Sequence, residues 1–170
     1  MHPTQIVVLA FGVAAIVGTL LLLLPISTAA GNSTSLVTAF FTAVSAVCIT
    51  GLTVVDTATH WSGFGQFVIM LLIQLGGLGI VSFATLLGLL ISGRISLKDR
   101  MNTLSEAKIV GADNVPKLLG RILLVYFGFE VVLATYLTLR MHLSYGQELL
   151  FSIWHGTFHA ISAFNNGGFS

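Results

Sequence analysis

Two short segments of this sequence have residues suited to binding a dehydrated cation. They read Ile49-Thr50-Gly51-Leu52 and Asn166-Gly167-Gly168-Phe169, and each follows an apolar stretch. Backbone carbonyls cannot stay bare in lipid, but carbonyls that line a wet pore can replace the water shell of a cation. Consecutive carbonyls can point toward one axis only if some residue adopts backbone angles that are forbidden to a residue with a Cβ. Glycine has no Cβ and can adopt them. These backbones are therefore candidate ion ligands. Alternatively, each glycine merely closes a turn between helices.

Two acidic residues are candidates for a supporting role. Asp56 follows the first segment, where a carboxylate can concentrate cations at a pore mouth; a solvated loop acid is the alternative. Glu130 lies within a long apolar stretch, where an ionisable group marks an ion pathway or locks helices together. It can equally be protonated, or hydrogen-bonded to a hydroxyl or amide of a neighbouring helix. Gln74 is a weaker candidate of the same kind.

Other reactive side chains give little support for catalysis. His155 and His159 are four residues apart, so they share a helix face and can in principle hold a metal. No Glu follows the first His, so the zinc-protease signature is missing. The single cysteine, Cys48, excludes an internal disulfide and is too few for a thiolate metal site. We therefore expect no resident metal centre.

The composition excludes a soluble protein. Of 170 residues, 55% are hydrophobic and 8% are charged, against about 25% charged in an ordinary soluble domain. Between Met1 and Gly93 the only formally charged side chain is Asp56. So few charges cannot cover a soluble surface, which excludes soluble enzymes and nucleic-acid binders. The chain is predicted to be an integral membrane protein.

The apolar runs predict three membrane spans and a shorter helix between the first two. A span needs about 20 apolar residues. Residues 4–24, which end before Pro25, residues 64–91, and a run from Asp113 or Asn114 to about residue 139 are long enough. Residues 36–49 are too few to cross, and Ser35 and its polar neighbours can cap their start. They predict a re-entrant helix whose C-terminal, partly negative end favours a cation.

An internal match at an offset of 117 residues links the two candidate segments. Residues 35–53 align with residues 152–170, and six positions are identical, including Ser45/Ser162 and Gly51/Gly168. The same offset lays the first span over the third. The predicted unit is span, short helix, glycine turn, span, and the chain ends within its second copy.

The basic residues predict the orientation. Six of the seven Lys and Arg lie between Arg94 and Arg121, which places that linker in the cytoplasm. The N-terminus is then cytoplasmic, and Asp56 faces outside. A cleaved signal peptide is the alternative for the first span, but it lacks a basic leading region. The predicted divisions are a first repeat over 1–92, a linker over 93–116 and an incomplete second repeat over 117–170.

Three motifs resemble the Ktr/Trk/HKT superfamily of potassium transporters, most closely the membrane pore subunit of the bacterial Ktr system. They are AVSAVCITGLT at 43–53, QLGGLGI at 74–80 and HAISAFNNGGFS at 159–170. The resemblance implies an all-α integral membrane protein with four span–pore-helix–filter–span repeats, similar to potassium channel pores. It implies potassium uptake across the plasma membrane, with K⁺ as the only metal, held by filter strands that contain Gly51 and Gly168.

The resemblance also implies partners. Members of the family form homodimers in the lipid bilayer and, in the Ktr type, dock on a cytoplasmic ring that binds the nucleotide; no nucleic acid and no covalent cofactor are implied. The linker 93–116 would belong to the docking face. Repeats three and four are missing from the chain, which looks like an N-terminal portion.

Gly76, Gly77, Gly79 and Gly88 are expected to allow close helix packing. The competing hypotheses are an intramembrane enzyme that uses Glu130 and the histidines, and a purely structural subunit.

Overall fold

The computed structural model describes residues 3–92 and 115–170, with side chains at residue 5 and over 7–79 and 120–170, and this part of the chain is mainly helical. Its elements are, in order, α1 (Pro3–Leu22), the short 3-10 helix η1 (Pro25–Ser27), α2 (Leu36–Val47), α3 (Thr57–His60), α4 (Gly63–Ser92), α6 (Val115–Tyr145) and α7 (Leu149–Phe164). No strand occurs among these residues, and the one β-bridge joins Thr28 to Trp61.

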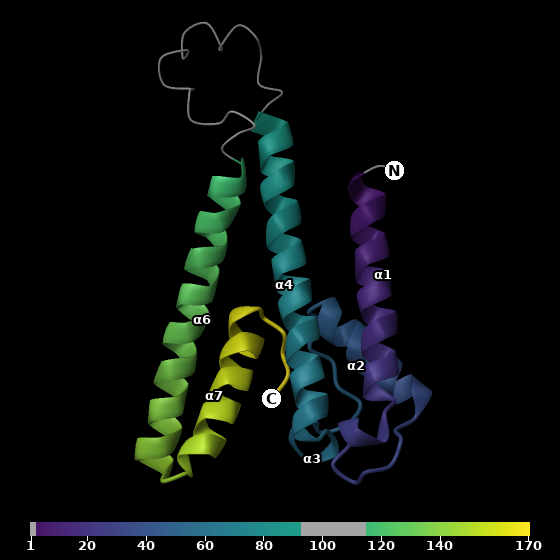
Figure 1. Ribbon diagram of the computed structural model, residues 1–170, viewed down its shortest axis with the longest axis vertical. Helices are drawn as coiled ribbons and strands as arrows, with labels where there is room; N and C mark the ends of the chain where they lie inside the picture. Colours follow the sequence, from purple (N-terminus) through teal and green to yellow (C-terminus); the bar gives the residue numbers. More distant parts are fainter. Residues whose placement is uncertain (1–2, 93–114) are drawn as a thin grey trace, which may run out of the picture.

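The long helices α1, α4 and α6 run along the same axis, and the short helices α2 and α7 occupy one half of the molecule (Figure 1). α2 packs against α1 and α4, whereas α7 packs against α6 and also contacts α4. The start of α1, the end of α4 and the start of α6 lie at one end of the molecule (Figure 1). Both short helices begin at the other end and stop part of the way along the long ones.

Local signals set most helix boundaries. α1 ends at Leu22, just before Pro25, and α2 begins after Ser35, whose hydroxyl accepts a hydrogen bond of 3.1 Å from the backbone N–H of Thr38. The expected cap of α6 at residue 113 or 114 lies outside the described residues. The predicted end of α6 at about residue 139 is wrong, because the helix continues to Tyr145 and is followed by Gly146, whose φ is +63°.

The structure supports the predicted spans unequally. Among the described residues, only the segment Gly120–Tyr145 is both long and apolar enough to cross a membrane by itself, and the apolar segments Val7–Leu22 and Gly63–Gly79 are shorter. α1 and α4 nevertheless contain 20 and 30 residues. At about 1.5 Å per residue, both helices reach about 30 Å or more.

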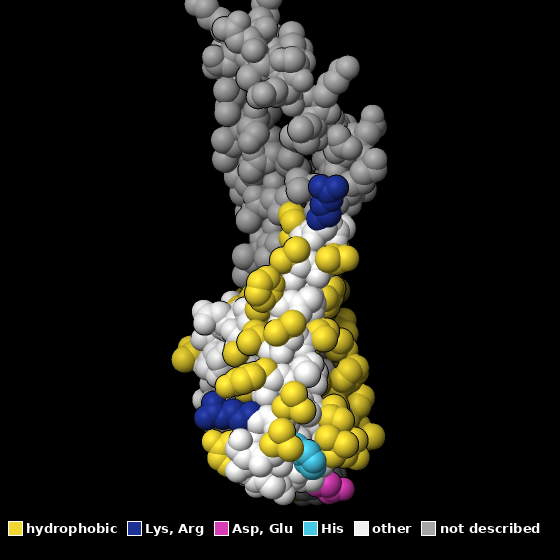
Figure 2. Space-filling view, turned by 90° about the vertical axis from the view of Figure 1, so that its left-hand side faces the viewer, with side chains coloured by type: hydrophobic (Ala, Val, Ile, Leu, Met, Phe, Trp, Pro, Cys, Tyr) yellow, Lys and Arg dark blue, Asp and Glu magenta, His cyan; other side chains and the backbone are white. Residues whose placement is uncertain are grey.

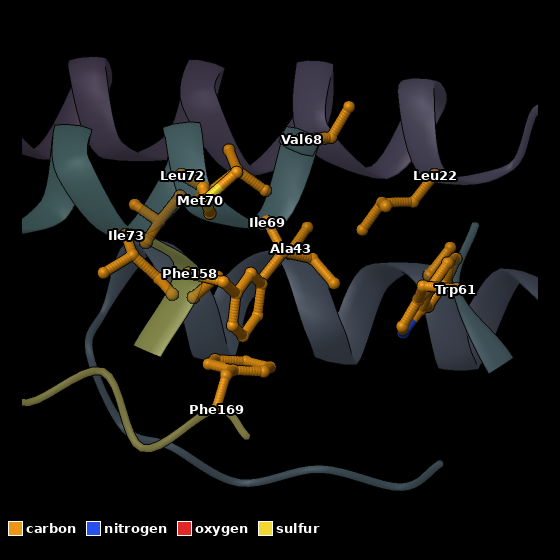
Figure 3. Close-up of a cluster of buried hydrophobic side chains, with 13 residues drawn as sticks. Leu22, Ala43, Trp61, Val68, Ile69, Met70, Leu72, Ile73, Phe158 and Phe169 are labelled. Atoms are coloured by element: carbon orange, nitrogen blue, oxygen red, sulfur yellow. The ribbon is translucent and has the colours of Figure 1, made fainter. Parts of the chain in front are cut away.

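The core gathers around one side of α4. Ile69 and Ile73 of α4 are fully buried between Ala43 of α2 and Phe158 of α7 (Figure 3). Phe169, which follows the second glycine turn, packs into the same cluster (Figure 3). The two short helices and the second turn thus share one hydrophobic core with α4.

The outer faces of the long helices are apolar and uncovered. Leu124 and Leu143 of α6 are each 75% exposed, and Val8 and Ile16 of α1 are also exposed. Figure 2 shows hydrophobic side chains along one such face, with charged side chains toward its ends. Uncovered apolar faces of this extent are typical of surfaces that contact lipid or further protein.

Glycines on α4 let other elements approach its backbone. A Cβ at Gly76 would collide with the backbone carbonyl of Val47, at the end of α2, and a Cβ at Gly77 would collide with the side chain of Asn165. At Gly79 it would lie 2.8 Å from a ring carbon of Phe11 in α1. The predicted close packing is confirmed at these three glycines, while Gly88 lies beyond the described side chains.

We expect Gly76→Ala to lower the free energy of unfolding of the full-length protein by about 1–3 kcal/mol, because the backbone of Val47 must move to admit the methyl group. Thermal unfolding in detergent measures the effect. Gly128→Ala is the matched control, since a Cβ at this helical glycine has no neighbour within 4 Å. Equal midpoints for the two variants would contradict the packing assignment.

Candidate functional site

The turns after α2 and α7 have the same backbone geometry. In the first turn φ is +56° at Ile49 and +71° at Gly51; in the second it is +57° at Asn166 and +71° at Gly168. The two pairs are 117 residues apart, which is the offset of the sequence match. The positive φ predicted for the two glycines is confirmed.

Both turns begin with a left-handed residue that is not glycine. Positive φ is rare for a β-branched side chain, so Ile49 is held there by its surroundings. A hydrogen bond closes each helix end in the same way. The N–H of Thr50 donates to the carbonyl of Ser45 at 3.0 Å, and the N–H of Gly167 donates to that of Ser162 at 2.6 Å. Nothing in the sequence around Ile49 signals this conformation.

A serine in each short helix holds its turn from behind. The hydroxyl of Ser45 accepts a hydrogen bond from the N–H of Leu52 at 2.9 Å and donates to the carbonyl of the same residue at 2.7 Å. Ser162 makes the same pair of bonds to Phe169, at 2.9 and 2.6 Å. Sequence comparison of the two segments found the identical serines but not this role.

The serines divide the candidate carbonyls into two groups. Those of Leu52 and Phe169 are already hydrogen-bonded to a hydroxyl. Within the described part of the chain, no hydrogen bond is made to the remaining carbonyls, which belong to Ile49, Thr50, Gly51, Asn166, Gly167 and Gly168. Each turn therefore has three consecutive acceptors that these described residues do not use.

The two turns meet at their glycines. A Cβ at Gly51 would lie 2.9 Å from the Cα of Gly168, and a Cβ at Gly168 would lie 2.6 Å from the Cα of Gly51. Backbone thus packs directly on backbone, and both positions also have positive φ. A side chain at either position is excluded by conformation and by space.

A cavity of about 420 Å³ adjoins the first residues of both turns. It is lined by the C-cap and the first turn residue on each side, Cys48 and Ile49 after α2 and Asn165 and Asn166 after α7, and by residues of α4, α6 and α7. An open space at the ends of two helices whose C-termini are partly negative is a favourable place for a cation.

The structure gives Asp56 a local role. Its side chain caps α3 by accepting a hydrogen bond of 3.1 Å from the N–H of Thr59. This hydrogen bond lies at an exposed position, so the cap does not remove the carboxylate from solvent. The contacts show an exposed acidic residue in a loop, which was one of the two interpretations of the sequence. That Asp56 attracts cations to a pore mouth stays a prediction.

Glu130 is buried and hydrogen-bonded to amides, which was one of the alternatives considered for it. Its side chain is 5% exposed, one oxygen accepts from the Gln74 amide at 2.6 Å, and the other accepts from the Asn165 amide at 2.9 Å. Asn165 directly precedes the second turn and was not singled out from the sequence. Tyr126 donates to the Gln74 side-chain oxygen at 3.1 Å and also bonds Asn165.

The two histidines of α7 lie beside a small cavity that Ser170, the residue after the second turn, also lines. The rings of His155 and His159 have centroids 6.3 Å apart, and the ring of Phe151 lies 4.0 Å from that of His155. Among the described residues, no group of three or more His, Cys, Asp or Glu is placed to hold a metal.

Comparison with known proteins identifies relatives over the whole chain. The TrkH family, described as a cation transport protein, matches residues 1–170. The chain is 42% identical to the Ktr system potassium uptake protein B of Bacillus subtilis (strain 168), over 99% of this chain and 37% of that protein. It is 36% identical to the potassium/sodium uptake protein NtpJ of Enterococcus hirae, with the same coverage, and 38% identical to the Ktr system potassium uptake protein D of B. subtilis. The chain spans little more than a third of the length of these relatives.

We expect Ser45→Ala and Ser162→Ala each to lower the free energy of unfolding by about 1–3 kcal/mol, because each leaves a backbone N–H and carbonyl of its turn without the hydroxyl. Thermal unfolding of the full-length protein measures this. Ser33→Ala removes an exposed hydroxyl as a control. Midpoints unchanged from that of the control would show that the serines do not hold the turns.

Proposed function

The chain belongs to the TrkH family of cation transport proteins, and on that premise we propose that it is part of the pore-forming subunit of a Ktr-type potassium-uptake system. Membership makes it a membrane protein. The relatives named above are potassium or potassium/sodium uptake proteins, which supports K⁺ as the transported ion and a place in the plasma membrane.

The observation that carries the proposal is the pair of matching turns with unused carbonyls. Three consecutive carbonyls in each turn accept no hydrogen bond within the described residues, and the turns meet at Gly51 and Gly168. Six such oxygens supply part of the shell that replaces water around K⁺. Leu52 and Phe169 serve as the anchored ends of the filter strands, because their carbonyls are bonded to serines.

The proposed architecture is a pore built from repeats. α1, α2 and α4 with the first turn form one span–pore-helix–span unit (1–92); the linker 93–116 follows; α6, α7 and the second turn begin another unit (117–170). Further units elsewhere in the full-length subunit close the pore. A homodimer in the bilayer and a cytoplasmic nucleotide-binding ring complete the system, with the nucleotide on the ring only.

The same arrangement supports a cytoplasmic N-terminus. The start of α1, the end of α4 and the start of α6 share one end of the molecule (Figure 1), and the basic linker joins α4 to α6. The positive-inside rule assigns that end to the cytoplasm. Asp56 and the starts of α2 and α7 then face outside.

An intramembrane enzyme is the weaker hypothesis. It would use Glu130 and the histidines, but both Glu130 oxygens accept hydrogen bonds from amides, and the histidines have no part in that cluster. A purely structural subunit is distinguished from a transporter by the flux experiment below.

Single-cysteine labelling tests the orientation. In a full-length background without other reactive cysteines, we expect Ala30→Cys to react with an impermeant maleimide added outside intact cells. Lys98→Cys should react only after the membrane is permeabilised, because it lies in the linker. The reverse pattern would overturn the orientation, and the cysteine-free parent controls for background.

Gly51→Ser and Gly168→Ser test the filter. In liposomes that hold the full-length protein, K⁺ should compete with rubidium for uptake far better than Na⁺ does. Each variant should lose at least about tenfold of this preference, equal to about 1.4 kcal/mol. The reason is that a Cβ at either position forces the turns apart. Gly31→Ser is the matched control, since it also has positive φ but no neighbour within 4 Å of its Cβ.

The outcomes separate the hypotheses. Unchanged selectivity in both filter variants would overturn the filter assignment. If wild-type protein gives no rubidium flux with or without its cytoplasmic partner, the transport function itself fails.

A further inference from the structure

A closed ring of hydrogen bonds lies behind the second turn. Gln74 of α4, Glu130 of α6 and Asn165 at the end of α7 each contact the other two. The Gln74 amide nitrogen donates to Glu130 Oε2 at 2.6 Å. The Asn165 amide nitrogen faces Glu130 Oε1 and Gln74 Oε1, both at 2.9 Å.

Hydrogen-bond chemistry requires one carboxylate in this ring. Asn165 presents the same atom, Nδ2, to both partners, and Gln74 presents its nitrogen to Glu130 and its oxygen to Asn165. Glu130 must therefore offer an acceptor on both sides, which a carboxylate does. If residue 130 were also an amide, any set of flips would leave two donors or two acceptors facing each other.

The ring is next to the turn, because Asn165 is the C-cap of α7 and directly precedes the first residue of the second turn. Its backbone N–H and its side-chain amide both donate to the carbonyl of Ile161, at 3.1 and 2.9 Å. The next residue, Asn166, has positive φ and begins the run of unused carbonyls. The Asn165 side chain is thus fastened one residue before the first of these carbonyls.

The first turn has no such anchor among the described residues. Its matching position is Cys48, which is exposed, and no hydrogen bond of its side chain occurs within that part of the chain. Of the two turns, the second is thus the one tied by a side chain to both α4 and α6. Since Gly168 packs on Gly51, the ring also sets where the second turn stands against the first.

We propose that Gln74, Glu130 and Asn165 are positioning residues that fix the second filter strand and thereby set the preference for K⁺ over Na⁺. They act through the turn and do not themselves touch the ion. The inference rests on the proposed function, in which the carbonyls of this turn bind K⁺. It assigns Gln74, from the first unit, to the filter strand of the second.

The test is a change that breaks the ring and a second change that rebuilds it. Glu130→Gln makes every member an amide and leaves one mismatched contact. Adding Gln74→Glu moves the carboxylate to the neighbouring position, where Asn165 again finds two acceptors and the new amide at position 130 donates to the new carboxylate. We expect Glu130→Gln to reduce the K⁺/Na⁺ preference in rubidium-uptake competition by at least about tenfold, and the double variant to restore it.

A matched control and the swap variant keep the outcome decisive. Glu148→Gln makes the same chemical change at an exposed residue whose side chain makes no capping bond, and its selectivity should equal that of wild type. If Glu130→Gln keeps wild-type selectivity, or if the double variant does not recover it, the inference is overturned. If Glu130→Gln yields no folded protein, the double variant decides. Folded protein that again prefers K⁺ supports the inference, and failure to recover such protein overturns it.

The two proposals fail differently. Absence of K⁺-selective uptake in wild-type protein contradicts the proposed function. A different result contradicts only the role of the ring. In that case wild-type protein takes up K⁺ selectively, Gly168→Ser abolishes the selectivity, and Glu130→Gln leaves it unchanged.

Discussion

Backbone polar groups in apolar surroundings need partners, and the rest of this structure depends on how two helix ends meet that need. α2 and α7 stop part of the way along the long helices (Figure 1), and a helix that ends among apolar elements leaves polar backbone groups that need partners. A serine near the end of each helix satisfies the N–H and carbonyl at the far end of the turn. The carbonyls between the helix end and the serine-bonded residue accept no hydrogen bond from the described residues, and on the proposed function they are the ligands of the cation.

α4 is the common support of both turns. Gly76 admits the end of α2, Gly77 admits Asn165, and the next turn of the helix toward its start carries Ile73 and Gln74. Ile73 belongs to the shared core (Figure 3), whereas Gln74 reaches Glu130 and Asn165. One stretch of helix therefore combines close backbone approach, apolar packing and a polar ring, and through it α4 holds the two units against each other.

The helices themselves follow from local sequence. Apolar runs, Pro25 and the capping Ser35 place α1 and α2 within a few residues of their observed bounds, because these signals act between residues close in the chain. The end of α6 was missed because no helix breaker occurs between residue 139 and Gly146, and the mixed polar composition of residues 140–145 is also typical of a loop. The need for glycine at positions 51 and 168 was also predictable, since a turn of aligned carbonyls demands positive φ.

The sequence alone therefore determined the membrane class, the short helices and the glycine turns, all of which depend on composition and on neighbours in the chain. Only the tertiary structure decided that Ile49 is left-handed, that Gly51 packs on Gly168, and which side chains bond Glu130. The partners of Glu130 are 56 and 35 residues away in the chain. The rotation of each helix about its axis and its position along its neighbours decide which polar groups meet across such distances. A single sequence specifies neither of these.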